Sequence, residues 1–251
     1  MDKPYRDVSP DWYAHAFGPL YPIVYAHRSV EAAQPEAAFA ARALGLSGNE
    51  CILDLCCGNA RHIMHLRNYA RCVVGLDFSP QLLAAAQEAV GEPSPLVRAD
   101  MREVPFTEAF DAVTNFFTSF GYFVDPLDNF RVISGLAEAL KPGGHFFIDH
   151  INREHALKTL VPESFREHEG YAIHDRRWFD SGSNRLSKRT TIRCNQKVVR
   201  EVEESVRLYS PAEFEALLDE GGLRVDALYG DYSGAALHLE APRMIAVGTK
   251  E

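Results

Sequence analysis

Three acidic residues, each at the end of an apolar run, are the residues best suited to chemistry in this sequence. Asp54 lies in ILDLCCGNARH, Asp77 in VVGLDFSP and Asp100 in LVRADM. Small residues at 57–60 let a backbone approach a ligand closely, and the helical segment that follows begins with free N–H groups. Because open α/β sheets bind ligands at the carboxyl ends of their strands, we expect the three carboxylates to line one site.

The positions of Asp77 and Asp100 are those of a nucleoside site. Asp77 lies 19 residues after Gly58 at the end of a strand, where a carboxylate can accept hydrogen bonds from the two hydroxyls of a ribose. Asp100 can hold an adenine amino group while apolar Met101 covers the ring. A dehydrogenase would also place an acid at Asp77, but the turn reads CCGNAR instead of Gly-x-Gly-x-x-Gly.

Short apolar runs that alternate with helical segments predict the elements that position these residues. Such alternation indicates a parallel sheet covered by helices on both faces. The segment after Ser210 repeats it, with an N-cap, a proline and a capping-box glutamate before a helix that ends at Gly221. The expected strands are residues 51–55, 72–76, 95–99, 110–117 and 145–149 and the final LRVDALYG and RMIAVGTK, with helices at 60–67, 81–90, 129–140 and 211–220 and a turn at 141–144.

A different pattern interrupts this alternation. Residues 172–179, 185–194 and 198–208 are strand-like and are separated by turns, which predicts an inserted antiparallel meander. The first fifty residues are helical in character and rich in aromatic side chains. The expected organisation is a helical lid over 1–45, a Rossmann-like domain over 46–155 and 209–251, and an inserted antiparallel region for substrate or lid over 156–208.

These motifs resemble those of the class I S-adenosylmethionine-dependent methyltransferases. The resemblance extends over nearly the whole chain and includes YPIVYAHR, NFFTSFGYF, LKPGGHFFID and GDYSG…PRMIAVGTK. It implies an α/β fold with a seven-stranded, mostly parallel sheet whose last strand is antiparallel. Within the class, the chain is similar to small-molecule enzymes with an antiparallel insertion, such as glycine and amino-sugar N-methyltransferases. Ala60 replaces the second glycine of the usual loop, and we expect a slightly displaced loop because alanine disfavours positive φ.

The resemblance implies ten cofactor-binding positions for S-adenosylmethionine and its product S-adenosylhomocysteine. Each residue is carried over by its place in the matching motif. Asp54 and Gly58 would border the methionine moiety, and Asn115 and Phe116 would lie below the sulfonium. Asp77 would hold the ribose, with Phe78 beside the adenine, and Asp100 and Met101 would contact the base. Tyr25 and Arg28 would close over the ligand, with Arg28 facing its carboxylate.

His150 is the candidate general base because it follows Asp149 at the end of the fifth strand. Its alternative is a hydrogen-bonded strand-end histidine. An oxygen nucleophile would need a base, whereas a nitrogen with a free lone pair would not, so the choice between N- and O-methylation stays open. The histidine spacings match no metal site, and Ser119 lacks a nucleophile elbow, so we expect neither a metal nor a hydrolase.

The charge and hydropathy of the sequence limit the kinds of partner that we expect the protein to bind. The formal net charge of −9 opposes phosphate binding over a broad surface, so a nucleic-acid substrate is disfavoured. No apolar stretch approaches the roughly 18 residues of a spanning helix, and no secretory signal begins the chain. We therefore expect a cytoplasmic protein that does not bind membranes, with its five cysteines reduced.

The predicted function is transfer of a methyl group from S-adenosylmethionine to N or O of a small molecule. One alternative is a protein that binds the cofactor through the same fold without catalysis. Another is a nucleic-acid methyltransferase. The meander also offers edge strands through which two chains could form a homodimer.

Overall fold

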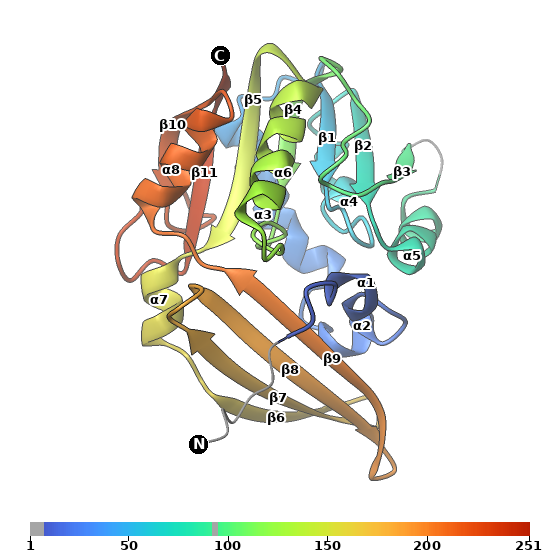
Figure 1. Ribbon diagram of the computed structural model, residues 1–251. Coiled ribbons are helices and arrows are strands. Elements are labelled where there is room, and N and C mark those ends of the chain that lie inside the picture. The colour runs from blue at the N-terminus through green and yellow to red at the C-terminus, as the bar shows by residue number, and fades with distance from the viewer. Residues whose placement is uncertain (1–7, 92–94) are drawn as a thin grey trace.

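The computed structural model describes residues 8–91 and 95–251. A seven-stranded sheet has the order β10-β11-β5-β4-β1-β2-β3, and β11 is antiparallel to both its neighbours. The predicted Rossmann-like sheet with an antiparallel last strand is thereby confirmed (Figure 1). The strands are β1 (Cys51–Leu55), β2 (Cys72–Asp77), β3 (Leu96–Arg98), β4 (Phe110–Asn115), β5 (Leu140–Ile151), β10 (Leu223–Tyr229) and β11 (Arg243–Lys250).

Helices cover both faces of this sheet. Helices α6 (Pro126–Ala139) and α8 (Pro211–Glu220) pack on one face, and α3 (Val30–Ala43), α4 (Ile63–Leu66) and α5 (Pro80–Val90) pack on the other. Successive strand side chains point to opposite faces, so Leu53 joins the first core and Ile52 the second. Both side chains are fully buried, as expected for a strand enclosed on two sides.

The helix boundaries follow the capping residues. Ser210 and Glu213 form the predicted capping box, and α8 spans the expected residues. Helix α6 begins at Pro126, three residues before the expected start, because Asp125 is its N-cap and accepts a hydrogen bond from Leu127 N at 2.9 Å. The Asp-Pro pair carried this signal in the sequence.

The expected turn at 141–144 lies inside β5. Leu140 pairs with Phe110 and His145 pairs with Ala112, so four residues of β5 stand opposite one residue of β4. The Lys-Pro-Gly-Gly segment therefore forms an irregularity within the strand instead of a turn before it, and Gly143 takes a φ of +71°.

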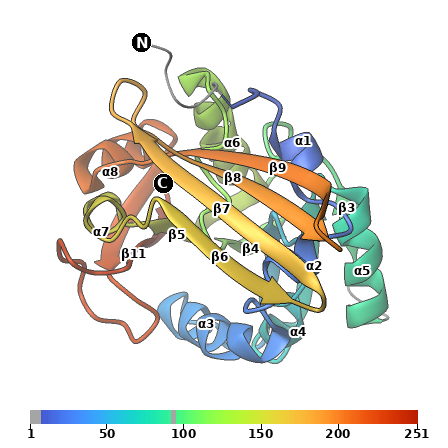
Figure 2. The same ribbon diagram turned by 90° about the horizontal axis from the view of Figure 1, so that it is seen from below.

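A second, four-stranded antiparallel sheet lies across the carboxyl ends of the parallel strands (Figures 1 and 2). Its strands are β6 (Glu163–His168), β7 (Tyr171–Asp180), β8 (Arg185–Cys194) and β9 (Lys197–Arg207), and α7 (Arg153–Lys158) leads into it. The three predicted strands are confirmed. Strand β6 was missed because Glu-Ser-Phe-Arg-Glu-His is mostly polar, and it pairs only at the sheet edge.

Acidic residues of β9 lie opposite the basic stretch on β8. Lys188 pairs with Glu204 at 2.9 Å and Arg189 with Glu203 at 2.5 Å, each directly across the two strands. Arg185 differs, because it is buried and donates hydrogen bonds to backbone carbonyls of the 121–123 segment.

Two short N-terminal helices, α1 (Tyr13–Ala16) and α2 (Tyr21–Val24), lie between the two sheets (Figure 1). Arg200 donates to His15 O at 2.7 Å and Arg166 donates to Val24 O at 2.9 Å, which ties these helices to the second sheet. The predicted helical lid begins within residues 1–7, outside the described part of the chain, and the domain boundaries stay predictions. Within the described ranges, no helix has the length and apolar character needed to cross a membrane.

Candidate functional site

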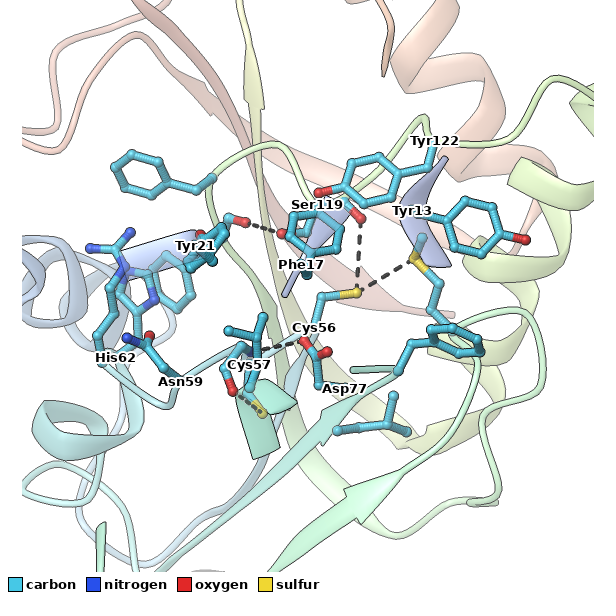
Figure 3. Close-up of a pocket in the computed structure, with 18 of the residues that line it drawn as sticks. Tyr13, Phe17, Tyr21, Cys56, Cys57, Asn59, His62, Asp77, Ser119 and Tyr122 are labelled. Atoms are coloured by element: carbon cyan, nitrogen blue, oxygen red, sulfur yellow. Dashed lines mark hydrogen bonds between the residues drawn. The ribbon is translucent and has the colours of Figure 1, made fainter. Parts of the chain in front are cut away.

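Two cavities lie where the carboxyl ends of the parallel strands meet the N-terminal helices and the second sheet. The first cavity opens at the ends of β1, β2 and β4. In Figure 3, Tyr13, Phe17 and Tyr21 lie on the side opposite Cys57 and Asp77. Seven of the ten predicted cofactor positions line this cavity: Arg28, Gly58, Asp77, Phe78, Asp100, Met101 and Phe116.

Asp77 is the best-defined polar group of the first cavity. Its two carboxylate oxygens accept one backbone hydrogen bond each, from Gly58 N at 2.9 Å and Ser79 N at 2.8 Å. Burial raises the pKa of Asp77, and these backbone hydrogen bonds oppose the shift. Each oxygen keeps a further lone pair, so this carboxylate suits a ligand with two neighbouring hydroxyls.

Asp100 already accepts hydrogen bonds from a protein side chain, which the sequence did not indicate. Arg102 donates to one carboxylate oxygen through its N and Nε, at 2.9 and 3.0 Å, and to the other through Nη2 at 2.7 Å. Burial alone would raise the pKa of Asp100, but these hydrogen bonds and the arginine charge lower it. One lone pair on Oδ2 stays free to accept an amino group, beside Met101 and the 39% exposed ring of Phe78.

The turn after β1 has a left-handed backbone at three positions. The φ values are 64° at Cys56, 57° at Gly58 and 64° at Ala60. The sequence predicted a displaced loop because alanine disfavours positive φ, but Ala60 adopts this φ itself and is fully buried. A non-glycine residue in this region costs about 1–2 kcal/mol, so the turn is held by its surroundings.

Asp54 and Asn115 do not line the first cavity. Asp54 is 1% exposed, and its Oδ1 accepts from Thr114 Oγ1 at 2.9 Å, whereas Oδ2 has no hydrogen-bond partner among the described residues. Burial raises the pKa of Asp54 to about 7. Asn115 Nδ2 donates to Leu55 O at 3.0 Å. Both side chains therefore link β1 to β4 beneath the cavity.

Arg28 lines both cavities and has an unusual environment for a half-buried guanidinium. Its Cζ lies 4.1 Å from the ring centroid of Tyr25 and 5.1 Å from that of Phe117, and Nη1 makes a long 3.4 Å hydrogen bond to Tyr21 Oη. Within residues 8–91 and 95–251 no carboxylate forms a salt bridge with it, and its buried Nε has no partner. A half-buried cation that lacks a counter-ion in this part of the chain suits an anionic ligand group.

A buried cluster of Glu36, Arg61 and His62 supports another wall of the first cavity. Glu36 Oε2 lies 2.9 Å from Arg61 Nη1 and 2.8 Å from His62 Nε2. His62 is buried, and its ring stacks on that of Phe116 with the two centroids 3.9 Å apart. Burial lowers the pKa of His62 well below its usual range, so the ring is neutral. The charge of Glu36 is therefore balanced by Arg61.

Asp149 at the end of β5 holds the turn after β4. It is fully buried, and Oδ2 accepts from Phe117 N at 2.8 Å and Tyr232 Oη at 2.5 Å, while Oδ1 accepts from Arg243 Nε at 2.6 Å. Arg243 Nη2 also donates to Thr118 Oγ1 at 2.8 Å. Phe117 and Thr118 have φ values of 56° and 59°, so two consecutive strained residues depend on this network.

The second cavity lies between the same turn, the N-terminal helices and the second sheet. It shares Phe17, Arg28, Phe117 and Tyr122 with the first cavity, so the two spaces adjoin. The polar side chains that the second sheet contributes are Arg177, Lys188 and Glu204.

Tyr25 lines the second cavity and not the first. Its hydroxyl donates a short hydrogen bond to Glu204 and accepts one from Lys188. Burial raises the pKa of Tyr25, followed in size by the nearby charge of Glu204. Tyr25 therefore joins the N-terminal helices to β8 and β9 at the wall of the second cavity.

His150 does not line either cavity, and the structure does not support it as a general base. Its side chain is 0% exposed and lies among the rings of Phe120, Tyr209 and Phe214. Its Nδ1 is 3.0 Å from Ile151 O, and burial lowers its pKa to about 4. The strand alternation that brings Asp149 to one face of β5 turns His150 to the other.

Sequence reasoning underestimated the aromatic residues of the N-terminal segment. The sequence indicated only that this segment is helical and rich in aromatic side chains. Tyr13 and Tyr21 line the first cavity, Trp12 and Tyr25 line the second, and Phe17 lines both. Their spacing of four residues from Tyr13 to Phe17, Tyr21 and Tyr25 could have indicated a common face.

Known proteins share both the sequence pattern and the fold. The model of a methyltransferase domain matches residues 52–144. A dTDP-3-amino-3,4,6-trideoxy-alpha-D-glucopyranose N,N-dimethyltransferase of Streptomyces venezuelae is 26% identical over 209 residues, which cover 76% of this chain and 82% of that protein.

Solved structures agree with this result. An S-adenosylmethionine-dependent methyltransferase from Clostridium acetobutylicum superposes with a TM-score of 0.77 at 17% identity, over 92% of this chain and 95% of its own. The sugar N-methyltransferase KedS8 from Streptoalloteichus superposes with a TM-score of 0.71 at 22% identity, over 100% of this chain and 99% of its own. At these identities the likeness shows a shared fold.

The raised pKa of Asp54 predicts a pH-dependent stability. Its folded-state pKa of about 7 lies above the ordinary 3.8, so ionisation favours the unfolded chain between these values. The contribution of Asp54 to the free energy of unfolding is complete below about pH 4 and falls as the pH rises to 7. We expect the free energy of unfolding to fall less for Asp54→Asn than for the unmodified protein as the pH rises from 5 to 8. Urea unfolding at each pH measures both values.

Asp111→Asn provides the opposite control for this measurement. Cys51 N–H and Lys141 lower the pKa of Asp111, so its contribution is lost as the pH falls. Equal slopes of stability against pH for Asp54→Asn and the unmodified chain would show that Asp54 is ionised in the folded protein.

The buried Asp149–Arg243 pair predicts a large stability loss for Asp149→Asn. The variant leaves Arg243 without its counter-ion, which costs about 3 kcal/mol or more in a buried pair. Lys141→Gln removes a comparably short but half-exposed pair with Asp111 and should cost about 1 kcal/mol or less. Urea unfolding measures both, and similar losses in the two variants would contradict the assignment of Asp149 as the holding group.

Proposed function

We propose that the chain, an S-adenosylmethionine-dependent methyltransferase with the class I fold, methylates the amino nitrogen of a nucleotide-linked amino sugar. The observation that carries the proposal is the pair of adjoining cavities that share Phe17, Arg28, Phe117 and Tyr122. The first cavity suits the cofactor, and the second is placed to receive the acceptor. The Streptomyces venezuelae relative is named for a dTDP-linked amino sugar, and the same substrate class for this chain is part of the proposal.

The residues of the first cavity fit S-adenosylmethionine. Asp77 keeps a lone pair on each oxygen for the ribose hydroxyls, and Phe78 and Met101 supply apolar surface for the adenine. Asp100 would accept the adenine amino group through its free lone pair. Arg28, which has no carboxylate partner in the described chain, would bind the carboxylate of the methionine moiety. Gly58 and Phe116 would complete this wall.

The bound cofactor supplies a methyl group already activated by its sulfonium. The chain's own residues would align the acceptor and exclude water, which is where much of the rate enhancement arises in such a reaction. The turn at Phe117 and Thr118, held by Asp149, forms the wall between the two cavities. It is placed to orient an acceptor toward the first cavity.

A nitrogen acceptor is favoured because His150 is buried away from both cavities. The remaining histidine of the second cavity, His27, has a pKa lowered by burial and by nearby Arg28, Arg166 and Lys188. The same positive surroundings would lower the pKa of an acceptor ammonium and favour the neutral amine with its free lone pair. An oxygen acceptor would instead require a base to remove its proton.

The proposal is tested by incubating the protein with S-adenosylmethionine and a panel of acceptors. The panel contains a dTDP-linked amino sugar, the same sugar with a hydroxyl in place of the amine, glycine, and a short RNA. We expect mass spectrometry to detect one or two added methyl groups on the amine alone. Methylation of the hydroxyl analogue would contradict the nitrogen assignment, and methylation of RNA would favour the nucleic-acid alternative.

The role of Asp77 predicts a specific loss of affinity. Asp77→Ala should weaken S-adenosylmethionine binding by roughly 1.5–3 kcal/mol, the scale of hydrogen bonds to a charged group. Calorimetric titration measures this change, with NAD as the control ligand that should not bind. An unchanged affinity in a folded variant would remove Asp77 from the ribose contact. Tight cofactor binding without transfer to any acceptor would favour the binding protein without catalysis.

Two further expectations concern partners and location. The homodimer through the edge strands of the inserted sheet stays a prediction, as does the cytoplasmic location. The exclusion of nucleic acid also stays a prediction, supported by the net charge of −9.

A further inference from the structure

The second cavity is positively charged within an acidic protein. Its lining contains Arg28, Arg177, Lys188 and Arg243 but a single carboxylate, Glu204. The whole chain has a formal net charge of −9. A local cationic surface on an acidic protein concentrates anionic ligands, so the cavity differs in kind from the rest of the molecule.

Salt bridges behind the lining balance part of this charge. Lys188 pairs with Glu204 at 2.9 Å, and Arg243 pairs with buried Asp149 at 2.6 Å. Each of these two pairs is neutral as a unit. The excess positive charge must therefore come from the other two cations of the lining.

Arg177 shares its carboxylate with another arginine. Arg177 Nη2 lies 2.7 Å from Asp175 Oδ2, and Arg166 Nη1 forms a shorter contact with the same oxygen. Asp175 is nearly fully buried and also accepts from Thr190 Oγ1 at 2.6 Å. Two guanidinium groups on one carboxylate leave one positive charge uncompensated, and Arg28 provides a second until the cofactor carboxylate proposed above pairs with it.

The neighbouring histidine responds to this excess. His27 lines the cavity, and after burial the causes that lower its pKa are all positive charges, namely Arg28, Arg166, Lys188 and Arg61. The charges surrounding His27 therefore act together as a cationic field. Such a field stabilises an anion and opposes a second cation in the same space.

We propose that Arg177, backed by the Arg166–Asp175 pair, is the anchor for an anionic group of the acceptor in the second cavity. The identity of that group rests on the proposed function, for which it is the diphosphate between nucleotide and sugar. Guanidinium groups present a planar fork of donors that matches phosphate oxygens. An anchor at Arg177, on the second sheet, would leave the sugar to extend toward the wall that the two cavities share.

Arg177→Gln tests this anchor without disturbing the fold. The substitution leaves Asp175 paired with Arg166 and Thr190, so no buried carboxylate loses all its partners. Arg176→Gln is the matched control, because Arg176 is the adjacent residue on β7, is 55% exposed in its side chain and pairs with Glu163 outside the cavity. Both variants change the net charge equally. Arg177→Lys keeps the charge and loses the fork.

The measurement is calorimetric titration of the protein saturated with S-adenosylhomocysteine. The titrants are dTDP and inorganic pyrophosphate, with thymidine as the neutral control and malonate as a carboxylate probe. We expect dTDP to bind and thymidine to bind far more weakly. Arg177→Gln should weaken dTDP binding by about tenfold or more, Arg177→Lys should recover part of this loss, and Arg176→Gln should change it by less than about twofold.

Two results would overturn the anchor, and a third would overturn the diphosphate as its ligand. Equal affinities for dTDP and thymidine would show that the cavity does not select an anion. Equal losses in Arg177→Gln and Arg176→Gln would show an effect of net charge alone. Malonate binding that exceeds that of both phosphate probes would replace the diphosphate with a carboxylate.

The outcome is separable from that of the proposed function. Methylation of an amine in the acceptor panel, with no binding of dTDP or pyrophosphate, would remove the anchor and leave amine methylation standing. Binding of dTDP that depends on Arg177, with no methylation of any amine in the panel, would retain the anchor and remove the amine as acceptor.

Discussion

Asp149 has no contact with solvent, yet its carboxylate joins four parts of the chain that are distant in sequence. It lies near the end of β5, holds the backbone of the turn after β4, pairs with Arg243 at the start of β11 and accepts a hydrogen bond from Tyr232. A carboxylate buried this deeply is tolerated only when charged and polar partners surround it. That constraint places Phe117 between the two cavities and so sets how their spaces meet.

The two sheets contribute different kinds of groups to the site because they differ in burial. The parallel sheet is buried on both faces, so its strand ends present rigid backbone donors and carboxylates, such as the Gly58 N–H and Asp77. The antiparallel sheet has a polar face, and its long cationic side chains line the second cavity. The N-terminal helices, rich in aromatic residues, lie between them (Figure 1) and contribute to both cavities.

Three predicted site residues lie away from the cavities, and the reason is the same for each. A motif places a residue along a strand, but the direction of its side chain depends on the strand's register and on what packs against it. Asp54 and Asn115 turn into the layer between β1 and β4, and His150 turns into an aromatic core instead of the cavity. Asp149, the adjacent residue, holds the turn after β4, a role that no motif of the sequence indicated.

The sequence by itself determined the α/β alternation, the antiparallel insertion, the acidic residues at the strand ends and the likeness of residues 52–144 to a methyltransferase domain, because these depend on local periodicity and short motifs. Only the tertiary structure decided that Arg28 lacks a carboxylate partner among the described residues, that Arg166 and Arg177 share Asp175, and that the aromatic rings line two adjoining cavities. The first and third properties depend on contacts between segments that are far apart in the sequence, such as those of Phe17 and Tyr122. The second depends on the pairing of β7 with β6, a strand whose polar sequence did not indicate it.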